Sequence, residues 1–426
     1  MVFRRPSSSH RQRQSRQGEP EGQPGTPGGG TMKSGREVHV LSVARTPFGR
    51  FAGGLSHFSA VQLATMTMSE VLRRSAVDSG HVTAVYAGVG MLGANVLTAT
   101  RQALVLGSGL PPTVPSLAVD RACCSGMTAI GLAFKDIRNG DAEVVLCGGF
   151  ESLSNTPFLW PRQRGARPGS VDVSDPLLLR AEFLDKAIAC YTGEEAEKMG
   201  IDRLQQDEWA VSSHNRFFSA ENAGFFSFER FSVDGLTGPI VCDESPRANT
   251  SVEALSRLET VYSSPTVTPG NAPGLSDGAA FVMLASGKFI ETHDLTGLAQ
   301  VLDYVQVAGA PTSGTHTPAD AIRALLSRSD LTLEQISRIE INEAFAATPL
   351  VSTLSLANGN RREAEKLRRR TNIDGGAVAI GHPLGASGAR ISMSLVNGLR
   401  RDGGGLGIAA ICGGYGQGDG LLIQAD

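Results

Sequence analysis

Along most of the chain, short runs of apolar side chains alternate with segments in which apolar side chains recur at helical spacing. This pattern predicts strands that alternate with helices. Short apolar runs are typical of buried strands, whereas apolar residues recurring every three or four positions are typical of helices packed on a core. The predicted strands are 40–43, 84–89, 114–119, 144–147, 280–285, 300–307, 339–341 and 408–411, with one more at the end of the chain. The predicted helices cover 60–74 and 100–106, and a third follows Cys123, carries Met127 and Ile137 on its apolar face and stops at Asn139-Gly140. Another begins with Thr317 as N-cap and Pro318 in its first turn. This order favours an α/β fold with helices on both faces of a mixed sheet.

The alternation stops between Ser154 and about Asn271. Prolines break the first part of this segment, and amphipathic helical pieces follow at 193–199 and 206–223. The segment therefore reads as an insertion into the first of two units. An internal echo supports two units, because Ser125-Gly126, a helix and Cys147-Gly148-Gly149 recur as Ser387-Gly388, a helix and Cys412-Gly413-Gly414.

These patterns divide the chain into five parts. The tail, 1–36, mixes arginine with Ser, Gln, Pro and Gly and is expected to be disordered and without function, since it cannot bury enough apolar surface. The first half covers 37–154, the insertion 155–270, a return to the first half 271–298 and the second half 299–426. Within the insertion, Arg162, Arg164 and Arg167 either contact phosphates or form solvated surface.

Composition narrows the classes of function. At 426 residues, with 41% hydrophobic and 19% charged residues, the chain is typical of a globular protein with more than one core. A net charge of −3 gives no support for nucleic-acid binding, and no apolar run approaches the roughly 18 residues of a membrane span. Six cysteines without a disulfide framework or zinc-like spacing predict a reducing, cytoplasmic location and no metal site.

Cys123 is the first candidate for chemistry, because it lies where a predicted strand runs into a predicted helix. The positive end of the helix dipole is expected there to lower the pKa of the thiol and to aim N–H donors at a developing charge. The alternative is a small buried core cysteine. Asn342, His382 and Cys412 also lie in loops at the ends of predicted strands, so they are expected to meet Cys123 at one edge of the sheet. His382 is then predicted to be the base that deprotonates Cys123, and the alternative is a structural histidine. The backbone N–H groups of the glycine-rich turn at Cys412 are predicted to form an oxyanion hole.

At these residues the chain resembles the thiolases, the family of acyl-CoA:acetyl-CoA acyltransferases. The motifs that carry the resemblance occur in the family's order from about Glu37 to the end, and they are Cys123-Cys124-Ser125-Gly126, Gly270-Asn271-Ala272-Pro273-Gly274-Leu275-Ser276-Asp277-Gly278-Ala279-Ala280, Asn342-Glu343-Ala344-Phe345-Ala346, Gly381-His382-Pro383-Leu384-Gly385-Ala386-Ser387-Gly388 and Cys412-Gly413-Gly414. The resemblance implies two similar five-stranded mixed-sheet α/β halves, an inserted loop domain that acts as a CoA-binding lid, and a homodimer or homotetramer. It implies acyl-CoA and acetyl-CoA as substrates and no permanently bound cofactor.

The resemblance also implies a role for each matched residue. Cys123 carries the acyl group as a thioester, and His382 is its base and helps to hold the thioester oxygen of the second substrate. Asn342 positions a water in that same oxyanion hole, and Cys412 is the second acid/base. The N–H groups of Cys123 and Gly414 stabilise the tetrahedral oxyanion. The residues expected at CoA are Pro273, Gly274, Ala344 and Phe345.

Four segments depart from the family pattern. Pro273 stands where a serine usually contacts pantetheine, and Thr192–Glu197 replaces a usual Met-Gly-x-Thr-Ala-Glu. Ser313–His316 stands where a Met-Gly pair is common, and Glu151–Ser154 keeps the usual Glu but not the usual Met. Acyl-chain preference and direction of reaction therefore stay open. The alternatives are a ketosynthase of the same fold, which usually lacks the second catalytic cysteine, and a non-catalytic thiolase-like scaffold, which needs none of the four reactive residues.

Overall fold

The computed structural model describes residues 36–91, 97–160, 173–178, 183–184 and 186–426. The tail up to residue 35 and the arginines at 162, 164 and 167 lie outside these ranges, so the two predictions made for them remain predictions. The described residues belong to one compact unit, Ser34–Asp426.

A mixed sheet runs through this unit in the order β10-β11-β12-β9-β1-β8-β5-β3-β4, with β2 paired to β8. The strands are β1 (Val38–Arg45), β2 (Gly49–Arg50), β3 (Ala84–Gly88), β4 (Ser116–Val119), β5 (Val144–Ser152), β8 (Ser276–Ser286), β9 (Ala299–Ala308), β10 (Ile336–Ile341), β11 (Gly405–Gly413) and β12 (Gln417–Ala425). Only three residue pairs, from Val38↔Val301 to Val40↔Ala299, join β1 to β9. This short contact divides the sheet into two halves.

The two halves repeat one topology, as the internal echo predicts. In the first half β4 and β5 flank β3 in parallel, and β8 and β1 follow in antiparallel pairs. In the second half β11 pairs with β10 in parallel, and β12 and β9 follow in antiparallel pairs. The counterpart of β4 is reduced to one parallel bridge between Ile339 and Thr371. The α/β class is confirmed, and the second half has four full strands where five were expected.

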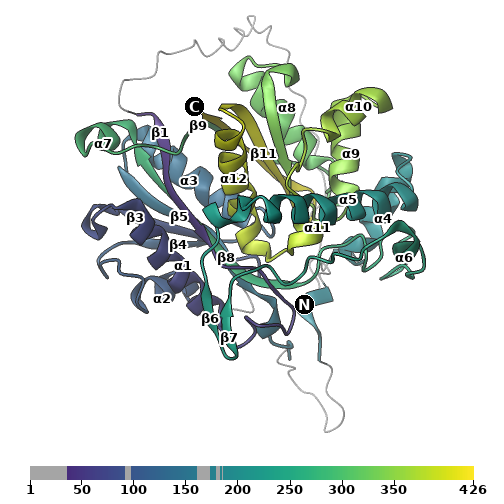
Figure 1. Ribbon diagram of the computed structural model, residues 1–426, viewed down its shortest axis with the longest axis horizontal. Coiled ribbons are helices and arrows are strands. Elements are labelled where there is room, and N and C mark those ends of the chain that lie inside the picture. Colours follow the sequence, from purple (N-terminus) through teal and green to yellow (C-terminus); the bar gives the residue numbers. More distant parts are fainter. Residues whose placement is uncertain (1–35, 92–96, 161–172, 179–182, 185) are drawn as a thin grey trace, which may run out of the picture. The chain divides into compact units, whose positions relative to one another are not determined.

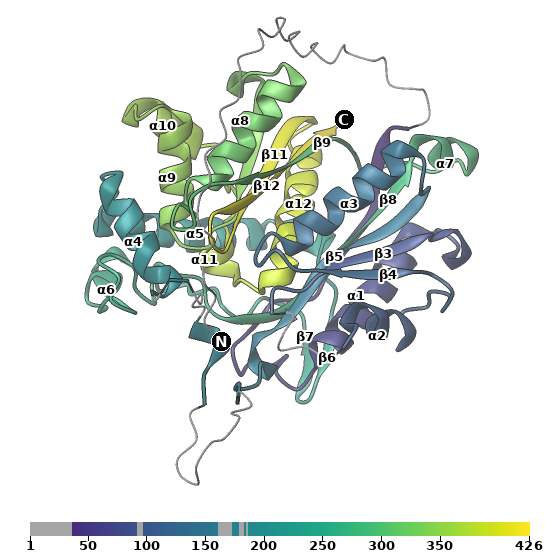
Figure 2. The same cartoon turned by 180° about the vertical axis from the view of Figure 1, so that it is seen from behind.

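Two long helices lie between the halves. α3 (Ser125–Asn139) packs against α12 (Leu384–Arg401), side by side in both views (Figure 1, Figure 2). Their apolar faces share one core with strands of both halves. The remaining helices of the two halves are α1 (Ala60–Ser75), α2 (Ala99–Val105), α7 (Gly287–Thr292), α8 (Thr317–Ser329), α9 (Ala347–Leu356), α10 (Arg361–Arg368) and α11 (Ala377–Ile380).

Between β5 and β8 the chain leaves the main sheet. This segment contains α4 (Ile188–Lys198), α5 (Arg203–Asn222), α6 (Val252–Ser256) and a separate two-stranded sheet of β6 (Val233–Gly235) and β7 (Gly238–Ile240). Its α5 is fastened to the second half through buried Glu343, which accepts hydrogen bonds from Trp209 Nε1 (2.9 Å) and Ser213 Oγ (2.8 Å). The motif that contains Asn342 is thereby held against the inserted segment.

Most predicted elements appear within a few residues of their predicted bounds. One detail is wrong: Thr317 is the first residue of α8, and His316 is its N-cap. The Thr317 hydroxyl donates instead to the carbonyl oxygens of Gly314 (2.9 Å) and Gln417 (2.8 Å). The tertiary contact with Gln417 thus takes the hydroxyl that a local cap would use. Among the described helices, none combines the length and apolarity needed to cross a bilayer.

Candidate active site

Cys123 lies in a tight turn between β4 and α3. Ala122 adopts a left-handed backbone conformation (φ 50°), which is strained for a residue other than glycine. The first residue of α3 stabilises the turn, because Ser125 Oγ accepts from the Arg121 N–H (2.8 Å) and donates to the Ala122 carbonyl (2.5 Å). The neighbouring Cys124 is completely buried and its Sγ contacts the Ile411 carbonyl oxygen at 3.5 Å. Only Cys123 of this pair lines the cavity described below.

A close crossing of α3 and α12 brings Cys123 and His382 together. A Cβ on Gly126 would lie 2.4 Å from the Gly385 oxygen, and a Cβ on Gly388 would lie 2.4 Å from the Met127 nitrogen. Glycines at the crossing therefore let the two helix N-termini approach backbone to backbone. Buried Glu151 reinforces this approach, since its Oε2 accepts from the Gly385 N–H (3.1 Å).

His382 is oriented to accept the proton of Cys123. Its Nε2 lies 3.3 Å from Cys123 Sγ, and its Nδ1 lies 2.6 Å from Ser387 Oγ. The Ser387 hydroxyl donates its single proton to the Pro383 carbonyl (2.9 Å), so Nδ1 donates to Ser387 and Nε2 is the unprotonated nitrogen. Burial, and secondarily the charge of Arg390, lowers the pKa of His382 to about 3. The imidazole is therefore neutral at physiological pH.

The pKa of Cys123 moves in the opposite direction from the one expected from the helix dipole. Burial raises the pKa of the Cys123 thiol well above its usual range, and nearby Cys412 and Glu151 raise it further. Desolvation of a thiolate thus outweighs the favourable helix end. The sulfur rests as a thiol hydrogen-bonded to a neutral imidazole, and proton transfer has to accompany its attack on a substrate.

Cys412 reaches the same cavity from the end of β11. A Cβ on Gly413 would lie 2.9 Å from the Arg121 oxygen and 3.0 Å from Cys124 Sγ, so this glycine lets β11 approach the turn of Cys123. Burial, followed by the charge of Glu195, raises the pKa of Cys412 to about 12. The backbone N–H of Cys412, and after it the Thr348 side chain, lower this pKa in part.

Asn342 and Gly414 complete the predicted set. Asn342 is fully buried, and neither polar atom of its side chain has a hydrogen-bond partner within the described structure. An amide buried in this way is suited to a polar group that arrives with the substrate. Gly414 lines the cavity, whereas Asn342 is not among the lining residues.

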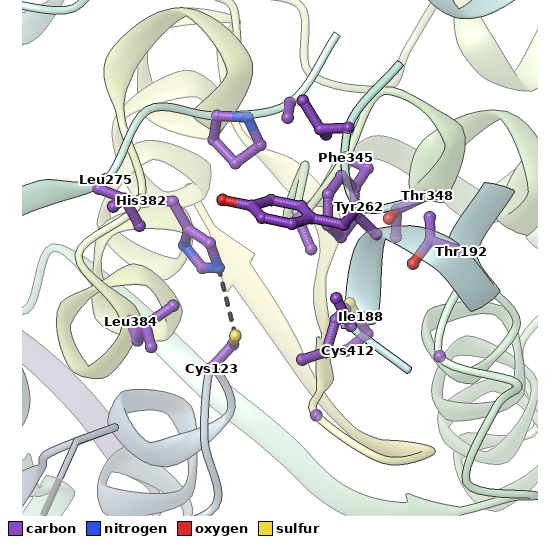
Figure 3. Close-up of a pocket in the computed structure, with 18 of the residues that line it drawn as sticks. Cys123, Ile188, Thr192, Tyr262, Leu275, Phe345, Thr348, His382, Leu384 and Cys412 are labelled. Atoms are coloured by element: carbon purple, nitrogen blue, oxygen red, sulfur yellow. Dashed lines mark hydrogen bonds between the residues drawn. The ribbon is translucent and has the colours of Figure 1, made fainter. Parts of the chain in front are cut away.

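The cavity encloses about 380 Å³ (Figure 3). Cys123, His382, Cys412 and the four residues expected at CoA (Pro273, Gly274, Ala344 and Phe345) all line it. The Gly274 carbonyl accepts a hydrogen bond from Ser276 Oγ (2.7 Å), and Ser276 Oγ accepts one from the backbone N–H of His382 (3.1 Å). The loop expected to contact CoA is thereby coupled to the histidine.

Some lining residues had no signal in the sequence. Tyr191, Arg247, Tyr262 and Thr348 come from separate segments and reach the cavity through packing. Ser387 is different, because its place five residues after His382 at the start of a helix makes a contact predictable. Within the described ranges, no group of three or more His, Cys, Asp or Glu side chains is arranged to hold a metal ion.

Comparison with known proteins gives the family. Residues 38–288 match the model "Thiolase, N-terminal domain" and residues 295–425 match "Thiolase, C-terminal domain". A β-ketoadipyl-CoA thiolase of Pseudomonas aeruginosa is 36% identical over 404 residues, covering 91% of this chain and 99% of the relative. The cytosolic acetyl-CoA acetyltransferase of Rattus norvegicus is 37% identical over 411 residues, covering 92% and 100%.

A solved structure agrees with these relatives. The crystal structure of human mitochondrial 3-ketoacyl-CoA thiolase superimposes with a TM-score of 0.85 at 34% identity, covering 92% of this chain and 99% of that one. The chain therefore belongs to the thiolase family. It is an acyltransferase, and thiolase-type acyl transfer between CoA thioesters fits its site.

Proposed function

We propose that the protein catalyses the thiolytic cleavage of a 3-ketoacyl-CoA and the reverse Claisen condensation with acetyl-CoA. The observation that carries the proposal is the 3.3 Å contact between His382 Nε2 and Cys123 Sγ, with Cys412 lining the same cavity. One thiol beside a base and a second thiol nearby are the groups that this two-step reaction needs.

In the first half of cleavage, Cys123 Sγ attacks the 3-keto carbon while its proton passes to His382 Nε2. The N–H groups of Cys123 and Gly414 stabilise the resulting oxyanion. The bond between C2 and C3 then breaks, and its electron pair forms the enolate of acetyl-CoA. The Cys412 thiol protonates C2 of this enolate, and His382 with an Asn342-held water stabilises the enolate oxygen.

In the second half, CoA attacks the acyl group on Cys123. The Cys412 thiolate left by the first half accepts the proton of the CoA thiol. Collapse of the tetrahedral intermediate breaks the bond to Cys123 Sγ, which recovers its proton from His382. The products are a shortened acyl-CoA and the starting enzyme, so protons and electrons balance.

The lining of the cavity suits an acyl group without a charge at its end. Its wall is largely apolar and includes Leu177, Leu178, Ile188, Val261, Leu275 and Leu384. Arg247 is the only permanently charged side chain among the lining residues of the described structure, and it suits a phosphate of CoA. We assign the CoA contacts to Pro273, Gly274, Ala344 and Phe345. We also assign the role of a lid to the inserted segment, 155–270. The first half then consists of 37–154 and 271–298, and the second half of 299–426.

CoA-dependent cleavage of 3-ketoacyl-CoA substrates of increasing chain length, together with a 3-ketodicarboxylyl-CoA, tests the proposal. We expect cleavage of uncharged substrates, abolished in Cys123→Ser. In Cys412→Ser we expect carbon–carbon cleavage to fall ~100- to 10,000-fold. We expect acylation of Cys123 by acetyl-CoA to fall far less, because a CoA thiolate is a much weaker base than the enolate carbon and depends less on a proton from Cys412. Equal losses of both half-reactions in Cys412→Ser would contradict the assigned role. Condensation without any cleavage would favour a ketosynthase instead.

We also propose that the protein is a homodimer or homotetramer that works in the reducing cytoplasm. Among the residues that the structure describes, strand β4 pairs only with β3 at the end of the sheet, and it exposes Leu117. Nearby Leu97 is 85% exposed. An open edge beside apolar side chains suits the same edge of a second copy. Fatty-acid degradation by β-oxidation is the pathway that the uncharged cavity favours.

A further inference from the structure

Buried Glu195 and half-buried His316 form a hydrogen-bonded pair that has no part in the mechanism described above. Glu195 of α4 is 7% exposed, and its Oε1 lies 2.5 Å from His316 Nδ1. Its Oε2 accepts the Thr315 N–H at 2.9 Å. The two partners belong to the two segments, Thr192–Glu197 and Ser313–His316, that both depart from the usual pattern of the family.

The pair is joined to the cavity through short connections. Thr315 lines the cavity together with Cys412, and its carbonyl accepts from Ser352 Oγ (2.7 Å). Gly314, one residue earlier, also lines the cavity. Thr317 donates to the Gln417 carbonyl (2.8 Å), and the Gln417 side chain donates to the Gly414 carbonyl (3.3 Å). The segment that carries His316 is thereby tied to the turn after Cys412.

We propose that Glu195 and His316 are a positioning pair for Cys412. The pair governs proton transfer at the Cys412 sulfur without itself touching the substrate. This inference rests on the proposed acid/base role of Cys412. A protonated His316 neutralises Glu195, and loss of that proton leaves an uncompensated carboxylate whose charge acts on the Cys412 sulfur. The carboxylate disfavours the thiolate, so the pair favours Cys412 as a base when His316 is charged and as an acid when it is neutral.

The surrounding charges are consistent with this arrangement. Glu195 raises the pKa of His316 chiefly through their hydrogen bond, and Asp320 adds to this effect while Arg323 of the same helix opposes it. Cys412 is faced by Glu195 and Tyr191 from α4 and by Cys123 and Cys124 from the turn before α3. The adjacent Glu194 is paired with Lys186 at the surface (2.6 Å), which makes it a matched control.

Alkylation of Cys412 by iodoacetamide, followed by peptide mass mapping in a Cys123→Ser background, measures its thiolate directly. Glu195→Gln removes the negative charge and keeps the acceptor for Thr315, so we expect alkylation at fixed pH to quicken on the order of three- to tenfold. His316→Gln leaves Glu195 uncompensated and is expected to slow it by a similar factor. Glu194→Gln is expected to have no effect. Shifts of the same sign in the Glu195 and His316 variants, or an equal shift in Glu194→Gln, overturn the proposal.

Deuterium exchange at C2 of acetyl-CoA provides the second measurement, with Cys123 intact. We expect its pH profile to move to lower pH in Glu195→Gln and to higher pH in His316→Gln, while the rate of Cys123 acylation changes far less than the rate of exchange. Normal exchange in Cys412→Ser would refute the proposed role of Cys412 itself. Exchange that is lost in Cys412→Ser but unshifted in both pair variants would refute only the inference about Glu195 and His316.

Discussion

At the scale of single residues, the resting site is a neutral pair of a thiol and an imidazole. Burial raises the pKa of Cys123 and lowers that of His382, so an ion pair between them is disfavoured in the free enzyme. Ser387 keeps the imidazole in the tautomer that accepts the thiol proton. The site is thus poised to create charge only when a carbonyl arrives to receive it.

Acylation is expected on Cys123 and not on Cys124. Cys124 is completely buried against the Ile411 carbonyl, whereas Cys123 faces the cavity. After incubation with acetyl-CoA, peptide mass mapping is expected to find the label on Cys123, with full labelling in Cys124→Ser and none in Cys123→Ser. Label on Cys124 would refute the assignment of the nucleophile.

Pro273→Ser is expected to tighten binding of the CoA substrate modestly. Proline offers neither an N–H nor a hydroxyl to pantetheine, and a neutral hydrogen bond is worth only ~1 kcal/mol, or roughly fivefold in affinity. Loss of the ring's rigidity offsets part of that gain. We expect a lower KM and an unchanged rate of Cys123 acylation in rapid-quench experiments. A collapse of activity or a changed acyl preference would show instead that Pro273 shapes the acyl pocket.

At the scale of elements, the crossing of α3 and α12 sets the distance between the two reactive side chains. Each helix carries one of them in the turn before its first residue, so a displacement of either helix separates sulfur from nitrogen. Gly385 lies in the first turn of α12, where a Cβ would meet the carbonyl oxygens of Gly88 and Phe150 at 2.6 Å. These neighbours are backbone atoms of the sheet and cannot rotate away.

Gly385→Ala is therefore expected to destabilise the protein and to slow acylation. Overpacking of this kind costs typically about 1–3 kcal/mol, and a misplacement of 1 Å at a reacting group costs on the order of 100-fold in rate. Gly309→Ala is the matched control, because its Cβ would meet only the Thr317 methyl group at 4.0 Å. Denaturant unfolding and single-turnover acylation check both effects. Normal acylation in Gly385→Ala would show that the crossing does not set the catalytic distance.

At the scale of the whole molecule, the repeated halves bring the ends of their strands and the starts of their central helices to one place. Cys123 and His382 occupy equivalent positions, each before the central helix of its half. Cys412 ends β11, the equivalent of β5 in the first half. In the described part of the second half a single bridge takes the place of β4, and the edge at β4 is the one that we propose as the contact with another copy.

Leu117→Lys is expected to weaken or abolish self-association. Leu117 is 48% exposed on an open strand edge, and a lysine there places charge in the proposed interface. Leu236→Lys is the control, since Leu236 is 81% exposed beside the separate β6–β7 sheet. Size-exclusion chromatography with light scattering gives the mass of each variant. A wild-type monomer, or an unchanged oligomer in Leu117→Lys, would contradict the proposed interface.

The order of strands and helices, the repeat and the loops that carry the reactive residues follow from the sequence alone. Their signals are local: apolar spacing, glycine stops such as Asn139-Gly140, and short motifs around Cys123, His382 and Cys412. The family follows from those motifs taken together. The two segments that contain Glu195 and His316, which form a hydrogen bond in the structure, are also visible in the sequence as departures from the family pattern.

Only the tertiary structure decides what depends on contacts between distant segments. The pKa of Cys123 rises because packing desolvates it, which a helix N-terminus read from the sequence does not reveal. The lack of a hydrogen-bond partner for the Asn342 amide within the described structure, and the contact between Glu195 and His316 across 121 positions, likewise depend on how distant segments pack together. Burial and charge in a protein interior are set by all the elements that surround a group, and these elements come from the whole chain.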